Sequence, residues 1–360
     1  MSVPETVREV RLARRPQGRP VAADLVVVET PAPEPAAGQV LLRNRWFLLF
    51  AGLVTLLGET PPGAPWPSIE PGDTLFGPAV GEVVDAPADS GLRPGDLVVH
   101  FRGWREYAVA EPSELTPLEK ELDDPAAHLA PGSVGYGVLT RTAPVRPGDT
   151  VLVTGAAGGV GTLVGQTARL LGAGTVIGTT GSPAKVERLR ELGYDAVLVD
   201  ERTDGAADGA VGDAAGGAAA RAERFARQLA EAAPDGIDLL VDNVGGHQAE
   251  AALAAARPGA RAALVGVLSG QLGDSPAAHP PLRLDAFQLI VKGVQLTGSG
   301  SAGQAEAEAA WRPRFGRWLR EGRITFPHVR VVGLERAPLA FQEMTEGRHF
   351  GTVLVELPAE

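Results

Sequence analysis

The chain has 360 residues, of which 44% are hydrophobic and 21% charged, and its formal net charge is -11. This composition is typical of a globular protein long enough for two domains, and the acidic balance argues against a nucleic-acid partner. The absence of cysteine excludes disulfides, thiolate catalysis and cysteine-ligated zinc. Without a signal-peptide core or an apolar run of membrane-spanning length, we expect a cytoplasmic protein with no membrane partner.

The first 120 residues or so are β-rich. Short apolar and β-branched runs, separated by turns rich in proline and glycine, predict strands at 7–12, 24–29, 39–43, 80–84, 97–101 and 107–110. Strands spaced this closely favour a small barrel-like domain.

Beyond residue 150 the pattern changes to an alternation of strands and helices. Strands are predicted at 151–153, 175–179, 196–199, 239–242 and 262–267, and helices at 163–171, 184–192, 221–233 and 249–256. This alternation predicts right-handed βαβ units and a parallel sheet. Residues 204–220 are almost wholly Ala, Gly and Asp and predict a flexible insertion. Further on we expect helices at 285–291 and 305–321 and strands at 293–297, 330–333 and 352–356.

A glycine-rich turn follows the strand at 151–153 and precedes a helical segment. Its glycines are Gly155, Gly158, Gly159 and Gly161. A strand, a glycine turn and a helix in this order place the helix N-terminus under a dinucleotide pyrophosphate. Glycines at this spacing also occur in ordinary tight turns, but the flanking elements favour a dinucleotide site, with Ala157 and Val160 of the same turn as further contacts.

The end of the next strand predicts which dinucleotide binds. An NAD site normally carries an acid about 20 residues beyond the glycines, where it holds the ribose 2′-hydroxyl. Here the strand ends in Thr180, Gly181 and Ser182, followed by Lys185. Hydroxyls, backbone N–H groups and a cation suit a 2′-phosphate, so NADP is favoured over the alternative that Lys185 is an ordinary surface lysine.

Asn243 follows a later strand, at the expected ligand crevice of an open α/β sheet. We expect it to contact the cofactor; the alternative is an amide that merely closes a turn.

Several motifs in one order resemble a known family. They are Arg15-Pro-Gln-Gly18, Gly103-Trp-Arg-Glu-Tyr107, Arg146-Pro-Gly-Asp149, Gly181-Ser-Pro-Ala-Lys185, Asp242-Asn-Val-Gly-Gly246 and Gly347-Arg-His-Phe-Gly351. Nearly the whole chain resembles the zinc-independent branch of the medium-chain dehydrogenase/reductase superfamily. Within that branch it is most similar to prostaglandin reductases and alkenal double-bond reductases, and less similar to quinone oxidoreductases.

The resemblance implies an α/β protein with two domains. A GroES-like β-barrel would comprise residues 1–130, completed by 325–360, and a Rossmann doubly wound parallel sheet would comprise residues 131–324. NADPH would bind in the cleft between them. Members commonly form homodimers through edge strands of the Rossmann sheets, here the strand at 293–297, although this strand could also be an ordinary internal one.

The resemblance also implies the reaction: hydride transfer from NADPH to the activated C=C of an α,β-unsaturated carbonyl compound. Val267 and Ser269 join the expected cofactor contacts. His349 corresponds to the family's asparagine near the nicotinamide, where an imidazole could donate to an enolate. Tyr136 matches a tyrosine expected beside the nicotinamide. The alternatives are a polar loop residue for His349 and a core tyrosine for Tyr136.

The chain departs from the family at several positions near the substrate. Phe50, Gln271 and His349 replace residues that the family uses there, and Asp200 replaces a tyrosine near the adenosine phosphate, where Arg202 could compensate. The expected apolar substrate could be lined by Trp46, Phe47, Phe50, Trp66, Gln271 and Phe287, although aromatic residues are more often part of a core. The six histidines have no metal-ligand spacing.

These departures leave other functions open. A quinone reductase and a specialised biosynthetic reductase or dehydrogenase are alternatives within enzymes. A nucleotide-binding structural or regulatory protein with little turnover is an alternative of another class.

Overall fold

The computed structural model describes residues 3–58, 67–118, 122–201, 214–272, 282–300 and 303–358. The chain divides into two compact units. The first comprises Met1–Ala130, Gln271–Ala278 and His328–Glu360, and the second comprises Pro131–Gly270 and His279–Pro327. None of the described helices is long and apolar enough to cross a membrane.

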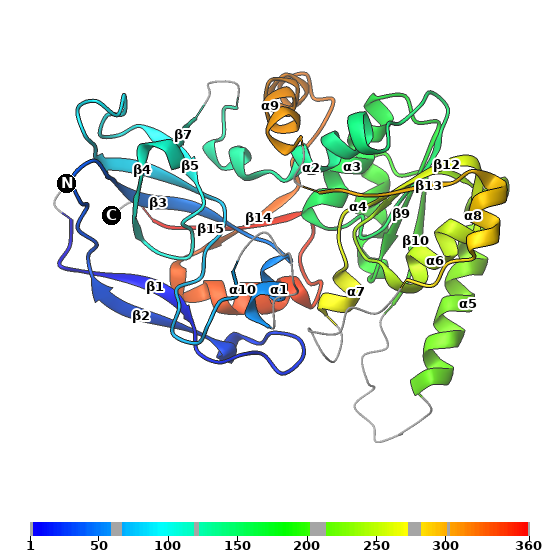
Figure 1. Cartoon of the computed structure of the whole chain (residues 1–360), viewed down its shortest axis with the longest axis horizontal. Helices are drawn as coiled ribbons and strands as arrows, with labels where there is room; N and C mark the ends of the chain where they lie inside the picture. Colours follow the sequence, from blue (N-terminus) through cyan, green and yellow to red (C-terminus); the bar gives the residue numbers. More distant parts are fainter. Residues whose placement is uncertain are drawn as a thin grey trace. The chain divides into compact units, whose positions relative to one another are not determined.

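Antiparallel strands dominate the first unit. Strands β1 (Thr6–Leu12) and β2 (Leu25–Pro31) pair with each other. A second sheet has the order β14-β15-β3-β4-β5-β7, with β6 also paired to β3. Its strands are β3 (Val40–Leu49), β4 (Ala79–Asp85), β5 (Leu97–His100), β6 (Tyr107–Ala110), β7 (Thr116–Pro117), β14 (His328–Val332) and β15 (Thr352–Glu356). The C-terminal β15 therefore lies beside the N-terminal β3, as Figure 1 shows in red and blue.

Three aromatic side chains pack together in the core of the first unit. Trp104 has no exposed surface, and its ring centroid lies 5.3 Å from that of Phe47 and 5.6 Å from that of Phe341. Phe341 belongs to α10 (Ala337–Thr345), a helix that the sequence pattern did not predict, as was also the case for α1 (Leu53–Leu57). Both helices are short, so an apolar period is hard to recognise in them.

The second unit contains one six-stranded parallel sheet in the order β10-β9-β8-β11-β12-β13. In chain order the strands are β8 (Thr150–Val153), β9 (Thr175–Thr180), β10 (Ala196–Val199), β11 (Ile237–Asp242), β12 (Ala256–Leu264) and β13 (Gln295–Gly298). This order, 3-2-1-4-5-6 in chain numbering, is that of the Rossmann fold. The predicted α/β fold class is confirmed.

Helices accompany this sheet. They are α2 (Gly132–Gly137), α3 (Gly159–Leu170), α4 (Val186–Glu191), α5 (Ala214–Ala232), α6 (Gly246–Ala254), α7 (Leu268–Gln271), α8 (Ala286–Lys292) and α9 (Gln304–Arg320). Phe225 and Leu229 of α5 are buried against β-strand residues such as Leu152, which confirms the predicted apolar face of that helix.

Two segments differ from the sequence expectation. Helix α5 begins at Ala214, so residues 214–220 of the predicted flexible insertion are helical, in keeping with the high helix propensity of alanine. Residues 204–213 of that insertion lie outside the described residues. Strand β12 begins at Ala256 rather than at 262, because Ala256 already pairs with Ile237 of β11; the register then shifts before Arg261 pairs with Leu239, and Gly259 in this irregular stretch has a φ of 75°.

A buried histidine ends strand β5 in the first unit. His100 is 4% exposed, and its Nδ1 accepts a hydrogen bond of 3.1 Å from the backbone N–H of Arg102. Burial, together with the charges of Arg102 and Arg105, lowers the pKa of His100 to about 3. The imidazole is therefore neutral in the folded protein at neutral pH.

This burial makes the folded state acid-sensitive. Between pH 6.5 and 3 the unfolded chain binds a proton at His100 that the folded chain does not bind, so stability falls as pH decreases through this range. We expect the melting temperature of His100→Gln to fall less between pH 7 and pH 5 than that of the wild type, measured by circular dichroism. An identical decrease in both proteins would contradict this role of His100.

Candidate functional site

The glycine turn joins β8 to α3 at the carboxyl end of the parallel sheet. Gly155 has a φ of 61°, a backbone conformation that favours glycine. The backbone N–H of Ala156 donates to the carbonyl of Thr179 at 2.8 Å, and the N–H of Gly158 donates to the carbonyl of Gly155 at 3.1 Å. The turn is thus tied to the neighbouring strand β9.

Helix α3 packs directly on this turn. A Cβ atom at Gly161 would lie 2.4 Å from the carbonyl oxygen of Gly155 and 2.6 Å from Cα of Ala156, so only glycine fits. Gly158 is the N-cap residue of α3 and is exposed. Because glycine has no side chain, no side-chain hydrogen bond caps the start of this helix. The first N–H groups of α3 and its positive dipole end therefore suit an anion such as a pyrophosphate.

A residue that the sequence reasoning missed supports the turn from behind. The hydroxyl of Tyr194 donates to the carbonyl of Gly161 at 2.7 Å, and burial raises the pKa of this phenol. A Cβ atom at Gly165 would lie 2.3 Å from the tyrosine ring, and one at Gly178 would lie 2.7 Å from it. The only signal in the sequence was a glycine inside a buried strand, which often marks a close approach of another group.

The predicted 2′-phosphate residues lie at the carboxyl end of β9. The Ser182 backbone N–H donates to Oγ1 of Thr180 at 3.3 Å, and Gly181 is exposed beside them. Lys185 ends a short 3-10 helix after this turn. Burial, with a smaller effect of the Arg188 charge, lowers the pKa of Lys185.

Asn243 and its neighbours join the carboxyl ends of β11 and β8. The Asn243 Nδ2 group donates to the carbonyl of Thr154 at 2.8 Å, and the Thr154 hydroxyl donates to Oδ1 of Asp242 at 2.6 Å. The same oxygen accepts the backbone N–H of Gly245 at 3.0 Å. Burial raises the pKa of Asp242. The Asn243 side chain therefore fixes two strand ends to each other.

A pocket in the second unit opens next to the segment that follows β11. Its lining includes Asp242, Gly245, Gly246, Gly266, Val267 and Ser269. The Ser269 backbone N–H donates to the carbonyl of Val244 at 2.9 Å, which holds α7 beside the turn. The structure thus brings three of the predicted residues, Asn243, Val267 and Ser269, to one place. The pocket lies outside the carboxyl ends of the strands, where open α/β sheets bind ligands.

Asp200 lies at the end of β10, where the family has a tyrosine. Its carboxylate pairs with Arg221 of α5, with an Nε–Oδ1 distance of 2.7 Å. Arg202, which the sequence offered as compensation, lies outside the described residues.

The aromatic candidates in the first unit are not alike. Phe47 is fully buried in the core beside Trp104. Trp46 is partly exposed, and the guanidinium carbon of Arg45 lies over its ring, 5.8 Å from the ring centroid. Phe50 is also partly exposed, with its ring centroid 6.4 Å from that of Phe101. Trp66 lies outside the described residues.

Two polar candidates also belong to the first unit. Gln271 Nε2 donates to Oγ1 of Thr55 in α1 at 2.9 Å. Nε2 of His349 lies 3.2 Å from the carboxylate of Glu343 in α10, so α10 positions the imidazole.

Tyr136 and Phe287 belong to the second unit and have opposite surroundings. Tyr136 of α2 is buried, with its ring centroid 5.8 Å from that of Trp311, and the Arg314 guanidinium lies 5.5 Å from it. Phe287 of α8 is 70% exposed. Among the described residues, no group of three or more His, Asp or Glu side chains is placed to hold a metal ion.

Comparison with known proteins identifies the family. The family described as "Zinc-binding dehydrogenase" matches residues 159–313, and "N-terminal domain of oxidoreductase" matches residues 8–118. Prostaglandin reductase 1 of Rattus norvegicus is 30% identical over 297 residues, which cover 80% of this chain and 83% of that protein. The chain belongs to the zinc-independent branch of the medium-chain dehydrogenase/reductase superfamily.

Other members of this superfamily match nearly the whole chain. The NADPH-dependent curcumin reductase of Escherichia coli (strain K12) is 28% identical over 358 residues, 97% of this chain and 96% of that protein. The crystal structure of CurA from Vibrio vulnificus in complex with NADPH has a TM-score of 0.82 at 28% identity, covering 98% of this chain and 100% of that one. The Rossmann and antiparallel units therefore follow the family fold.

Proposed function

We propose that this protein uses NADPH to reduce the activated C=C of an α,β-unsaturated carbonyl compound. The observation that carries the proposal is the glycine turn beneath α3, together with the hydroxyls at the end of β9 and Lys185 shortly after it, in place of an acid. Relatives described as curcumin, prostaglandin and 2-alkenal reductases support the reaction class.

The residues present fit this cofactor. The N–H groups at the start of α3 would hold the pyrophosphate, because no side chain is needed or accommodated at Gly161. Thr180, Ser182 and Lys185 would hold the 2′-phosphate. The pocket beside Asn243, Val267 and Ser269 would receive the nicotinamide end.

The chemistry divides between cofactor and protein. Bound NADPH supplies the hydride that adds to the β-carbon. The protein has to stabilise the enolate oxygen and deliver a proton to the α-carbon. Of the two candidate donors, His349 is favoured because Glu343 holds its imidazole while part of the side chain stays exposed. Tyr136 packs against Trp311, which favours a structural contribution.

A substrate panel tests the reaction. The purified protein is mixed with NADPH and with enones, enals and quinones, and the absorbance of the reduced cofactor is followed. We expect the wild type to consume NADPH with enones or enals. We expect His349→Phe to have a lower turnover but an unchanged affinity for NADPH. Consumption with quinones alone would favour the quinone reductase alternative. NADPH binding without consumption on any substrate would contradict the proposal and favour a binding protein.

Lys185 should decide between the two nicotinamide dinucleotides. Lys185→Ala removes the cation proposed for the 2′-phosphate, so we expect the dissociation constant for NADPH to rise about tenfold, the scale of one charge-assisted hydrogen bond. Binding of NADH should change less than twofold (roughly, within a few tenths of a kcal/mol). Calorimetric titration measures both. An equal loss for the two cofactors would contradict the role of Lys185.

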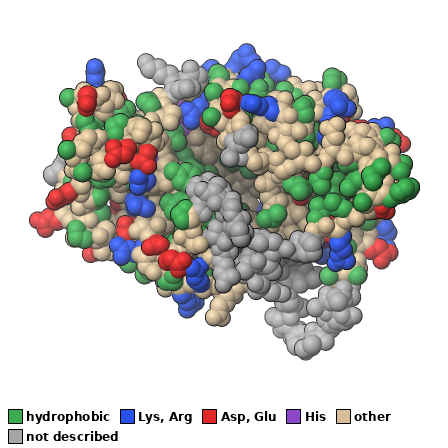
Figure 2. All heavy atoms as spheres, in the orientation of Figure 1, with side chains coloured by type: hydrophobic (Ala, Val, Ile, Leu, Met, Phe, Trp, Pro, Cys, Tyr) green, Lys and Arg blue, Asp and Glu red, His purple; other side chains and the backbone are tan. Residues whose placement is uncertain are grey.

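We further propose a homodimer that forms through β13. This strand is at the edge of its sheet, and its four residues are exposed. Beside it, α8 exposes Phe287, Ile290 and Val291 at 70, 76 and 65%. Figure 2 shows hydrophobic side chains gathered over α8. An exposed edge strand and an apolar helix face favour pairing with a second copy.

Sedimentation tests this dimer. Ile290→Asp puts a charge into the proposed interface, so we expect a monomer where the wild type sediments as a dimer. Leu339→Asp is the matched control, because Leu339 is 48% exposed on α10 of the other unit. A wild type that sediments as a monomer at micromolar concentration would contradict the proposal.

A further inference from the structure

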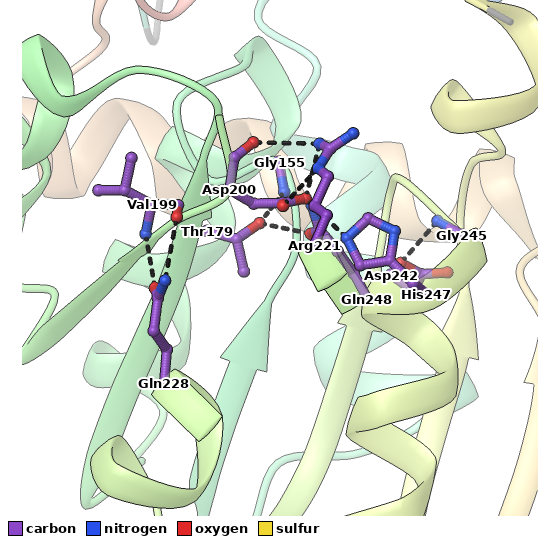
Figure 3. A network of polar contacts seen from close by, with 10 residues as sticks. All are labelled: Gly155, Thr179, Val199, Asp200, Arg221, Gln228, Asp242, Gly245, His247 and Gln248. Atoms are coloured by element: carbon purple, nitrogen blue, oxygen red, sulfur yellow. Dashed lines mark hydrogen bonds and ion pairs between the residues drawn. The ribbon is translucent and has the colours of Figure 1, made fainter. Parts of the chain in front are cut away.

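A continuous series of hydrogen bonds joins the glycine turn to the end of β10 (Figure 3). The backbone N–H of Gly155 donates to Oγ1 of Thr179 at 3.0 Å. The Thr179 hydroxyl donates to Oε1 of Gln248 at 2.8 Å. The Gln248 Nε2 group then donates to Oδ2 of Asp200 at 2.7 Å. The donor and the acceptor of each hydrogen bond are defined, because the carboxylate at the end of the series can only accept.

Asp200, at the end of this series, is held in place by further hydrogen bonds. Its side chain is 1% exposed and also accepts hydrogen bonds from Arg221, at 2.7 and 2.8 Å, and from Nε2 of His247, at 2.9 Å. Burial alone would raise the pKa of Asp200, but its hydrogen-bond donors outweigh burial and lower the pKa to about 2. The carboxylate is therefore ionised at neutral pH and binds its donors strongly.

The series connects elements that are far apart in the chain. Gly155 follows β8, Thr179 belongs to β9, Asp200 follows β10, and Gln248 belongs to α6. Helix α5 is also attached to β10, because Gln228 exchanges hydrogen bonds of 3.2 and 3.3 Å with the backbone of Val199 (Figure 3).

The two central side chains are almost inaccessible to solvent. Thr179 is 1% exposed and Gln248 is 5% exposed. Water cannot easily replace a lost partner in such surroundings, so removal of one member leaves the next one unpaired.

We propose that Thr179 and Gln248, anchored on Asp200, are positioning residues that hold the Gly155 peptide in the conformation that binds the dinucleotide pyrophosphate. The inference rests on the proposed function. It assigns these residues to the pyrophosphate, which NADPH and NADH share, and not to the 2′-phosphate. Loss of the series should therefore weaken both cofactors equally, unlike the loss of Lys185.

The test compares two substitutions at one position. Thr179→Val keeps the side-chain shape but removes the hydroxyl, whereas Thr179→Ser keeps the hydroxyl. For Thr179→Val we expect the dissociation constants of NADPH and NADH to rise by the same factor, about tenfold, as for one lost buried hydrogen bond. Thr179→Ser should restore both constants to within about twofold, and Gln248→Leu should resemble Thr179→Val.

A ligand without a pyrophosphate separates positioning from general damage. Adenosine 2′-phosphate should bind wild type, Thr179→Val and Gln248→Leu equally well, measured by displacement of NADPH fluorescence or by calorimetry. Unchanged NADPH binding in both variants, or an equal loss of adenosine 2′-phosphate binding, would overturn the inference. Failure of the wild type itself to bind NADPH would instead contradict the proposed function.

Discussion

The site depends on the close packing of α3 against the glycine turn. Because a Cβ atom at Gly161 would lie only 2.4 Å from the carbonyl oxygen of Gly155, the first turn of the helix packs closely on the glycine turn at the carboxyl end of β8. Its N–H groups then face the position of an anion without competition from a side chain. The Tyr194 hydroxyl donates to the carbonyl of Gly161, Asn243 attaches the turn to β11, and the Ala156 N–H attaches it to β9, so the ends of β8, β9 and β11 are joined at one edge of the sheet. The proposed cofactor role follows from this edge.

Much of this edge could be predicted from the sequence. The apolar runs of β8 to β12 and the glycines between β8 and α3 are local signals, and the alternation of strands and helices predicts right-handed βαβ units in a parallel sheet. The contacts of Tyr194, Thr179 and Gln248 could not be predicted, because each joins residues separated by tens of positions in the chain. Thr179 and Gln248, for example, are 69 residues apart. Only the folded sheet brings them together.

The candidate substrate residues were harder to judge for a different reason. An aromatic side chain has the same sequence signal whether it is buried or exposed. Phe47 is a core residue and Phe287 is largely exposed, although both were candidates for the same lining. His349 is placed by Glu343 of α10, a helix too short to be recognised by its period. The cofactor could therefore be predicted from residues close together in the sequence, whereas the residues that contact the substrate depend on the tertiary structure.

The most direct measurement is the affinity of Gly161→Ala for NADPH, with Gly217→Ala as the control. A Cβ atom at Gly161 meets backbone at 2.4 Å, whereas one at Gly217 in α5 meets nothing within 4 Å. If the turn binds the cofactor, Gly161→Ala should lose at least about tenfold in affinity, since overpacking of this kind costs about 1–3 kcal/mol, and Gly217→Ala should bind as the wild type does. Wild-type affinity in folded Gly161→Ala would contradict the account.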